Sequence, residues 1–155
     1  MNEEALLGLD WYQIWRHLYH LIIAFVLAFP LGWDREKGSE SGAGLRTFPL
    51  VALGSCAFML TAIAVLDSTD AESRVLAGIL TGIGFIGGGA ILKGGASVAG
   101  TATAASIWNT GAIGMAVAWD RFEIALVLSV LNFFTLQFMP VIKANAELPQ
   151  EGKDA

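Results

Sequence analysis

The densest group of chemically active side chains is the charged run Asp34-Arg35-Glu36-Lys37, followed by a Gly/Ser-rich stretch and then by Gly44-Leu45-Arg46-Thr47. Asp34 comes directly after Leu31-Gly32-Trp33, so we expect its carboxylate at the edge of a hydrocarbon layer. An ionisable group at that depth is costly and is usually paired or functional. Asp34 therefore has two predicted partners, Arg46 across the short loop or a cation such as Mg²⁺, which suits carboxylates with retained waters. The alternative is a solvated border of charge.

A second candidate group is the polar face formed by Thr103, Ser106 and Thr110, with Asn109 beside it. Positions i, i+3 and i+7 share one face of a helix. In lipid such groups hydrogen-bond to neighbouring helices for roughly 0.6 to 2 kcal/mol each. This face is predicted to join helices or to line an ion path near Asp34. Weaker candidates, expected to serve packing or the interface, are Asn132, Thr135 and Gln137.

The segment Gly82–Gly87 matches the dinucleotide-binding pattern G-x-G-x-x-G. That fold needs a preceding strand and an acidic residue about 20 positions later, and the chain has no Asp or Glu between Glu72 and Asp120. We therefore interpret the glycines as helix-packing and self-association surfaces, because small residues four apart let helices approach closely. The predicted packing set is Gly78, Gly82, Gly84, Gly87, Gly88 and Gly89.

The positions of the two histidines and the single cysteine favour structural roles over catalytic ones. His17 and His20 stand among Trp and Tyr residues, which favours interfacial anchoring over a metal site. The single Cys56 excludes an intramolecular disulfide. Because the sequence carries no HExxH motif, phosphate loop or nucleophile–base pair, we expect neither an enzyme nor a cofactor, with Mg²⁺ possible as ligand or substrate.

The surrounding sequence predicts membrane helices that position these groups. The 155 residues are 55% hydrophobic and 15% charged, with a mean hydropathy of +0.61, and a bilayer-spanning helix needs about 20 mostly apolar residues. Five apolar runs qualify, in an all-α membrane domain over residues 1–142 with a disordered cytoplasmic tail at 143–155. The runs are Trp15–Leu31, Phe48–Leu66, Val75–Leu92, Ala102–Ala118 and Phe122–Ile142.

Local signals mark where these helices begin and end. Thr69-Asp70-Ala71-Glu72 resembles a capping box at the start of the third helix, and Thr47 is expected to start the second. Pro30 predicts a kink or stop near the inner end of the first helix. Residues 93–100 are expected to be a flexible connection.

The distribution of Lys and Arg predicts the orientation. With five helices, one side of the membrane collects six basic residues and the other collects three, and the richer side is cytoplasmic. The N-terminus should face out and the C-terminus in. The inner set is Arg35, Lys37, Arg46, Lys93, Lys143 and Lys153, and the outer set is Arg16, Arg74 and Arg121. The net charge of −5 does not resemble the basic surface of a nucleic-acid-binding protein.

Four segments, taken in order, resemble the MgtC/SapB family over about residues 21–136. They are Gly32–Arg35, Ala43–Gly54, Gly82–Gly89 and Gly100–Trp108. Carried over one by one, the family-like positions are Asp34, Arg35, Gly44, Arg46, Thr47, Gly84, Phe85, Gly87, Gly89, Thr103, Ala104, Ala105 and Trp108.

The resemblance implies a bacterial inner-membrane protein linked to magnesium homeostasis and, in some members, to survival inside host cells. Members have been described as transporters and as regulators of membrane ATPases, so both functions stay open. Asp34 stands where the family usually has Glu, and Phe48 replaces its histidine. The chain ends about where many relatives begin a soluble domain, so we carry over no role of that domain. Expected partners are the lipid bilayer, a second copy in a homodimer and, for the regulator alternative, another membrane protein.

Overall fold

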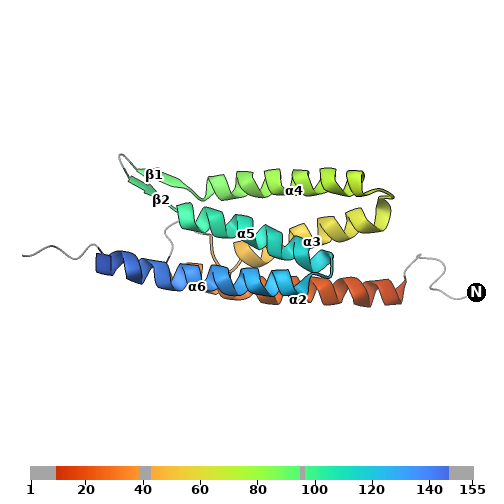
Figure 1. Ribbon diagram of the computed structural model, residues 1–155, viewed down its shortest axis with the longest axis horizontal. Helices are drawn as coiled ribbons and strands as arrows, with labels where there is room; N and C mark the ends of the chain where they lie inside the picture. Colours follow the sequence, from red (N-terminus) through yellow and green to blue (C-terminus); the bar gives the residue numbers. More distant parts are fainter. Residues whose placement is uncertain (1–9, 39–42, 95–96, 147–155) are drawn as a thin grey trace, which may run out of the picture.

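The computed structural model describes residues 10–38, 43–94 and 97–146, and five helices lie within them (Figure 1). Each predicted apolar run forms one helix, which confirms the all-α membrane fold. The helices are α2 (Trp11–Gly38), α3 (Thr47–Val65), α4 (Thr69–Gly89), α5 (Thr101–Ala118) and α6 (Phe122–Ala146).

Three of these helices are long and apolar enough to cross a membrane, over Trp11–Lys37, Thr47–Val65 and Phe122–Pro140. α4 begins with a charged turn, and both α4 and α5 are rich in Gly, Ala, Ser and Thr, which lowers their hydropathy. That these two helices also cross the membrane stays a prediction. The surface agrees with a lipid environment, because large apolar side chains such as Phe85, at 86% exposed, and Val65, at 69%, cover it.

α5 is the central helix of the bundle. Figure 1 shows α2 and α6 side by side below it, with α4 on the opposite side, and α3 packs along it. The α3–α5 contact is close because α5 presents glycine there: a methyl group added to Gly114 would overlap the Ala52 carbonyl oxygen. Gly111 lies equally close to the Ile83 side chain of α4. Neither glycine belonged to the predicted packing set.

The predicted packing glycines lie on α4, and only one of them packs within the chain. A Cβ at Gly87 would stand 3.1 Å from the Ala104 carbonyl oxygen of α5, whereas the positions of the other five open into empty space. α4 buries only Ile83 and Gly87. Within one chain, the predicted role in helix packing is therefore seen at Gly87 alone, because α4 lies at the edge of the bundle. Self-association through the open glycines stays a prediction.

The helix ends differ from expectation at several points. α3 starts at Thr47 as predicted. The cap of α4 is Ser68, whose backbone is extended and whose hydroxyl accepts a hydrogen bond from the Ala71 N–H. The cap lies one residue before the expected Thr69, and the expected capping box does not form because Ala71 has no side chain that could return a bond. α2 continues through Pro30 to Gly38 and so carries the charged run on a helix. α6 continues to Ala146, into the predicted tail, and residues 147–155 lie outside the described part.

The connection between α4 and α5 contains a β-hairpin rather than only a flexible loop. β1 (Leu92–Gly94) pairs antiparallel with β2 (Ser97–Ala99), and Lys93 lies opposite Val98. Gly100 then takes a left-handed conformation with φ of 83° as the N-cap of α5, where a side chain would overlap the Ala90 carbonyl. The turn therefore requires glycine.

Candidate functional site

Asp34 lies at the C-terminal end of α2 in an ion pair that is largely shielded from solvent. Its Oδ2 accepts hydrogen bonds from Arg35 Nη2 at 2.8 Å and from Arg35 Nε at 3.1 Å. The side chains of Asp34 and Arg35 are 10% and 15% exposed. Neighbouring residues on a helix do not normally face each other, so the long Arg35 side chain curls back to reach the carboxylate.

The predicted pairing of Asp34 with Arg46 is wrong. Arg46 is exposed and occupies the N-cap position of α3, while Arg35 satisfies the carboxylate from within α2. The described residues Gly44 and Leu45 do lie against α2, but another residue holds them there. Glu36 Oε2 accepts a hydrogen bond from the Leu45 N–H at 3.0 Å.

The contact between α2 and this loop depends on two glycines. A Cβ at Gly32 would lie 3.1 Å from the Gly44 carbonyl oxygen, and one at Gly44 would overlap the Glu36 carboxylate. Glu36 is a site residue that the sequence analysis did not single out. The sequence could have indicated this role, because an acidic side chain is stabilised beside the N-terminus of a helix such as α3. Thr47, the first residue of α3, is half-buried beside this contact.

The polar face of α5 is buried. Thr103 and Ser106 are each 2% exposed and Thr110 is fully buried, while Asn109 is half-buried. Ser106 Oγ donates a hydrogen bond to Asn132 Oδ1 on α6 at 2.9 Å. Within the described residues, the hydrogen bonds of Asp34 go to Arg35 and none reaches this face. Among the described residues, no hydrogen bond therefore joins the charged pair to the polar face that was expected to line it.

Asn132 is more important to this face than its sequence position indicated. It is 6% exposed, and its Nδ2 has no hydrogen-bond partner among the described residues. One turn away on α6, Ser129 Oγ donates to the Leu27 carbonyl of α2 at 2.6 Å. These two side chains join α6 to α5 and to α2 through polar contacts inside the bundle, as interhelical hydrogen bonds commonly do in membranes.

An apolar groove of about 880 Å³ lies between α3 and α4. Leu50, Gly54 and Phe58 contribute to its α3 wall, and Gly78 and Gly82 contribute to its α4 wall. Two of the predicted packing glycines thus line a concave surface rather than a helix contact.

The described residues hold no group of three or more His, Cys, Asp or Glu side chains placed to bind a metal ion. Asp34 is thus a single carboxylate paired with a guanidinium. Mg²⁺ is often held through one or two carboxylates while it keeps several waters.

Comparison with known proteins identifies the family. The model of the MgtC family matches residues 21–145. The "Putative magnesium transporter YhiD" of Escherichia coli K12 is 35% identical over 127 residues, which cover 77% of this chain and 59% of that protein. Protein SrpB of Synechococcus elongatus is 34% identical over 149 residues, covering 88% of this chain and 80% of SrpB.

Protein MgtC of Salmonella typhimurium LT2 is 35% identical over 115 residues, covering 74% of this chain and 48% of MgtC. This chain thus spans about half of MgtC and about three fifths of YhiD. No solved structure matches it. Because the family model matches residues 21–145, which include part or all of each of the five helices, and the aligned segment of YhiD is 35% identical, the chain belongs to the MgtC family.

Proposed function

We propose that this protein acts in magnesium homeostasis as a multi-pass protein of the bacterial inner membrane. The family match and the printed name of the YhiD relative support magnesium as the ion. The observation that carries a role in cation movement is the Asp34–Arg35 pair, a charged pair held at low exposure at the end of an apolar helix.

In this proposal Asp34 receives a hydrated Mg²⁺ and Arg35 is its competitor. With no cation present, the guanidinium neutralises the carboxylate and lowers the cost of holding it at the membrane edge. An arriving cation displaces Arg35 from Oδ2, and coordination water supplies the remaining ligands. The hydroxyls of Thr103 and Ser106, with Asn109, offer oxygen atoms deeper in the bundle. We assign no enzymatic step and no resident cofactor to the protein.

Magnesium entry into liposomes tests this function. We expect liposomes carrying the purified protein to take up Mg²⁺ faster than protein-free liposomes, as followed with a trapped Mg²⁺-sensitive dye. Asp34→Asn should reduce uptake at least about tenfold, because the neutral amide loses the Coulomb attraction for a divalent ion. Arg46→Gln is the matched control: it removes an exposed charge at the same end of the bundle and should keep uptake. Absence of uptake by folded wild type, or full uptake by Asp34→Asn, would count against transport.

A second candidate function is regulation of another membrane protein, such as an ATPase, without transport. The apolar groove and the uncovered glycines of α4 favour it, because small residues in an exposed helix face allow close approach of a second helix. The same face could join two copies of this chain in a homodimer.

Gly84→Leu tests this surface. No atom lies within 4 Å of a Cβ placed there, so the variant should fold with unchanged thermal stability. It should nevertheless lose pull-down of the membrane partner, because the larger side chain holds the partner helix away. Gly84→Ala is the control and should retain pull-down. A Gly84→Leu variant that still captures the partner would exclude this face as the interface.

A further inference from the structure

His20 is buried, at 2% exposed, and both of its ring nitrogens face oxygen acceptors. Nδ1 lies 2.7 Å from the Arg16 carbonyl oxygen of the same helix. Nε2 lies 2.8 Å from Asp120 Oδ1, a hundred residues away in the turn between α5 and α6. The ring therefore ties α2 to that turn. This contact goes beyond the interfacial anchoring expected of the histidines.

The number of protons decides whether both contacts can form. A neutral imidazole carries one N–H, and a backbone carbonyl and an ionised carboxylate can only accept. Neutral His20 beside ionised Asp120 would therefore direct a lone pair at one of the two oxygens. The observed arrangement needs a second proton, either on the ring or on the carboxyl group. Rising pH removes that proton and breaks one contact.

The backbone at Asp120 supplies an independent reason to assign a role to its carboxylate. The Arg121 N–H donates to the Ala116 carbonyl at 2.9 Å and the Asp120 N–H donates to the Val117 carbonyl at 3.0 Å. These two bonds form a Schellman turn that ends α5, with Asp120 at its left-handed position, at φ of 58°. Glycine is the usual residue there, because other residues are strained. An aspartate at this position gains a contact to His20 that glycine could not make.

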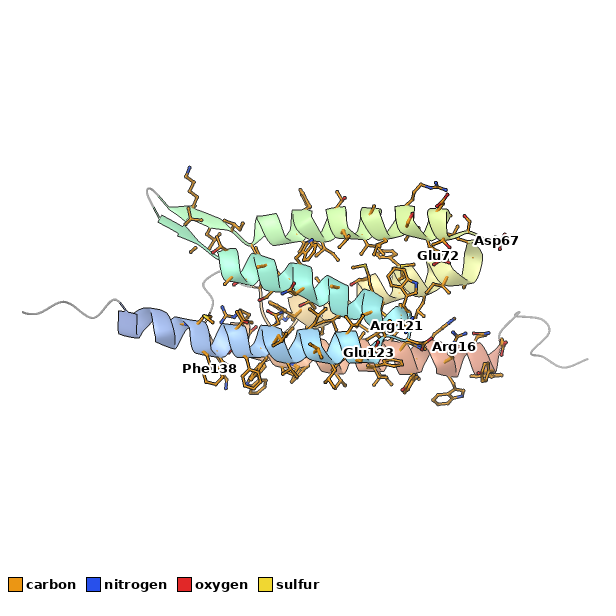
Figure 2. All side chains as sticks on the ribbon, viewed as in Figure 1. Arg16, Asp67, Glu72, Arg121, Glu123 and Phe138 are labelled. Atoms are coloured by element: carbon orange, nitrogen blue, oxygen red, sulfur yellow. The ribbon has the colours of Figure 1, made fainter. Side chains whose placement is uncertain are left out.

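Asp120 is the acidic partner of the His20 ring, and the other groups around the ring are mostly aromatic. The rings of Tyr19 and Phe122 pack around His20, with centroids 5.6 and 5.9 Å from it. Figure 2 shows Arg16, Arg121 and Glu123 toward the same end of the bundle, with Asp67 and Glu72 on the α3–α4 side. Among the described residues, only Asp120 forms a side-chain bond with the His20 ring. The other titratable and charged groups near this end are Asp10, Tyr12, Arg16, His17, Tyr19, Asp67, Asp70, Glu72, Arg74, Arg121 and Glu123.

We propose that His20 and Asp120 form a proton-operated latch, which holds the α5–α6 turn against α2 when protonated and releases it as pH rises. The Asp120 side chain is 59% exposed, so protons reach the pair from solvent. The latch lies in the N-terminal half of α2, whereas the Asp34–Arg35 pair lies near its C-terminal end. It acts on helix contacts and does not depend on which ion, if any, the protein moves.

Nitrogen NMR of the full chain, labelled with ¹⁵N-histidine and held in nanodiscs, tests the latch directly. The chain has two histidines, so the spectrum contains two rings, and His17→Gln assigns them. Spectra are compared at about pH 5.5 and about pH 8, and we expect both nitrogens of His20 to be protonated in the closed latch and only one in the open latch. A His20 ring that stays neutral throughout, while Asp120 stays ionised, would overturn the proposal.

Thermal unfolding over the same pH interval tests the coupling to structure. The wild-type Tm should fall by about 5 °C as pH rises, because a charge-assisted hydrogen bond is lost. Asp120→Asn and Asp120→Gly both suit the left-handed turn but lack the carboxylate, so their profiles should be flat. His17→Gln should keep the wild-type slope. An unchanged slope in both Asp120 variants, or a slope that His17→Gln removes, would contradict the latch.

Discussion

Replacing Gly114 by valine is expected to destabilise the protein strongly. A Cβ at this position would overlap the Ala52 carbonyl oxygen and lie 2.9 Å from Ser55 Oγ. The first obstacle is backbone, so no rotamer change can relieve it, and α3 and α5 must move apart. Overpacking of this kind costs about 3 kcal/mol, and the Tm should fall by about 10 °C.

Thermal unfolding in detergent, followed by circular dichroism, measures this effect. Gly88→Val is the matched control, because it makes the same change on α4 at a position with open space around it. Its Tm should stay within about 2 °C of the wild type, since surface substitutions usually change stability by about 0.5 kcal/mol or less. Equal Tm losses in the two variants would mean that valine is harmful in any of these helices, and that the α3–α5 contact is not special.

The number and approximate positions of the helices could be predicted because they depend on local properties. An apolar run of sufficient length forms a helix in a membrane whatever it packs against, since its backbone groups must be satisfied internally. The spacing of Thr103, Ser106 and Thr110 similarly placed them on one face, and all three are buried. The hairpin after α4 was not predicted. The glycines in this segment favour a flexible loop, and the strands that contain Lys93 and Val98 are too short to give a pattern of their own.

Contacts between distant segments could not be predicted, because they depend on which helix faces which. His20 and Asp120 are 100 residues apart and Ser106 and Asn132 are 26 apart, and no local pattern links the members of either pair. The glycines show the same limit. Gly87 and Gly114 pack closely, whereas Gly88 lies in open space, although all three belong to small-residue stretches. Composition predicts that helices approach closely, and only the fold decides where.

The error at Asp34 has a different cause. A partner across the loop was predicted because adjacent residues on a helix point in different directions. A long arginine overcomes that divergence when the alternative is an unpaired charge at low exposure. The Arg46 side chain is exposed, so water can solvate its charge and it needs no carboxylate partner.

Charge reversal at Asp34 is expected to produce the second large effect. Asp34→Arg places two guanidinium groups side by side where each side chain now has at most 15% exposure. Removing one member of a buried ion pair costs about 3 kcal/mol. Combining Asp34→Arg with Arg35→Asp rebuilds the pair in the opposite order and should restore most of the lost Tm. Combining it with Arg46→Asp should restore little, because Arg46 is exposed and does not bond Asp34.

The same double variant separates the structural role of the pair from its proposed role in transport. In D34R/R35D the carboxylate moves one position along the helix, which turns it by about 100°. If Asp34 receives the cation, the restored protein should be stable and yet fail to carry Mg²⁺ into liposomes. Full recovery of both Tm and uptake would mean that any local pair of opposite charges suffices. Recovery of Tm only with R46D would instead place the functional ion pair across the loop, between positions 34 and 46.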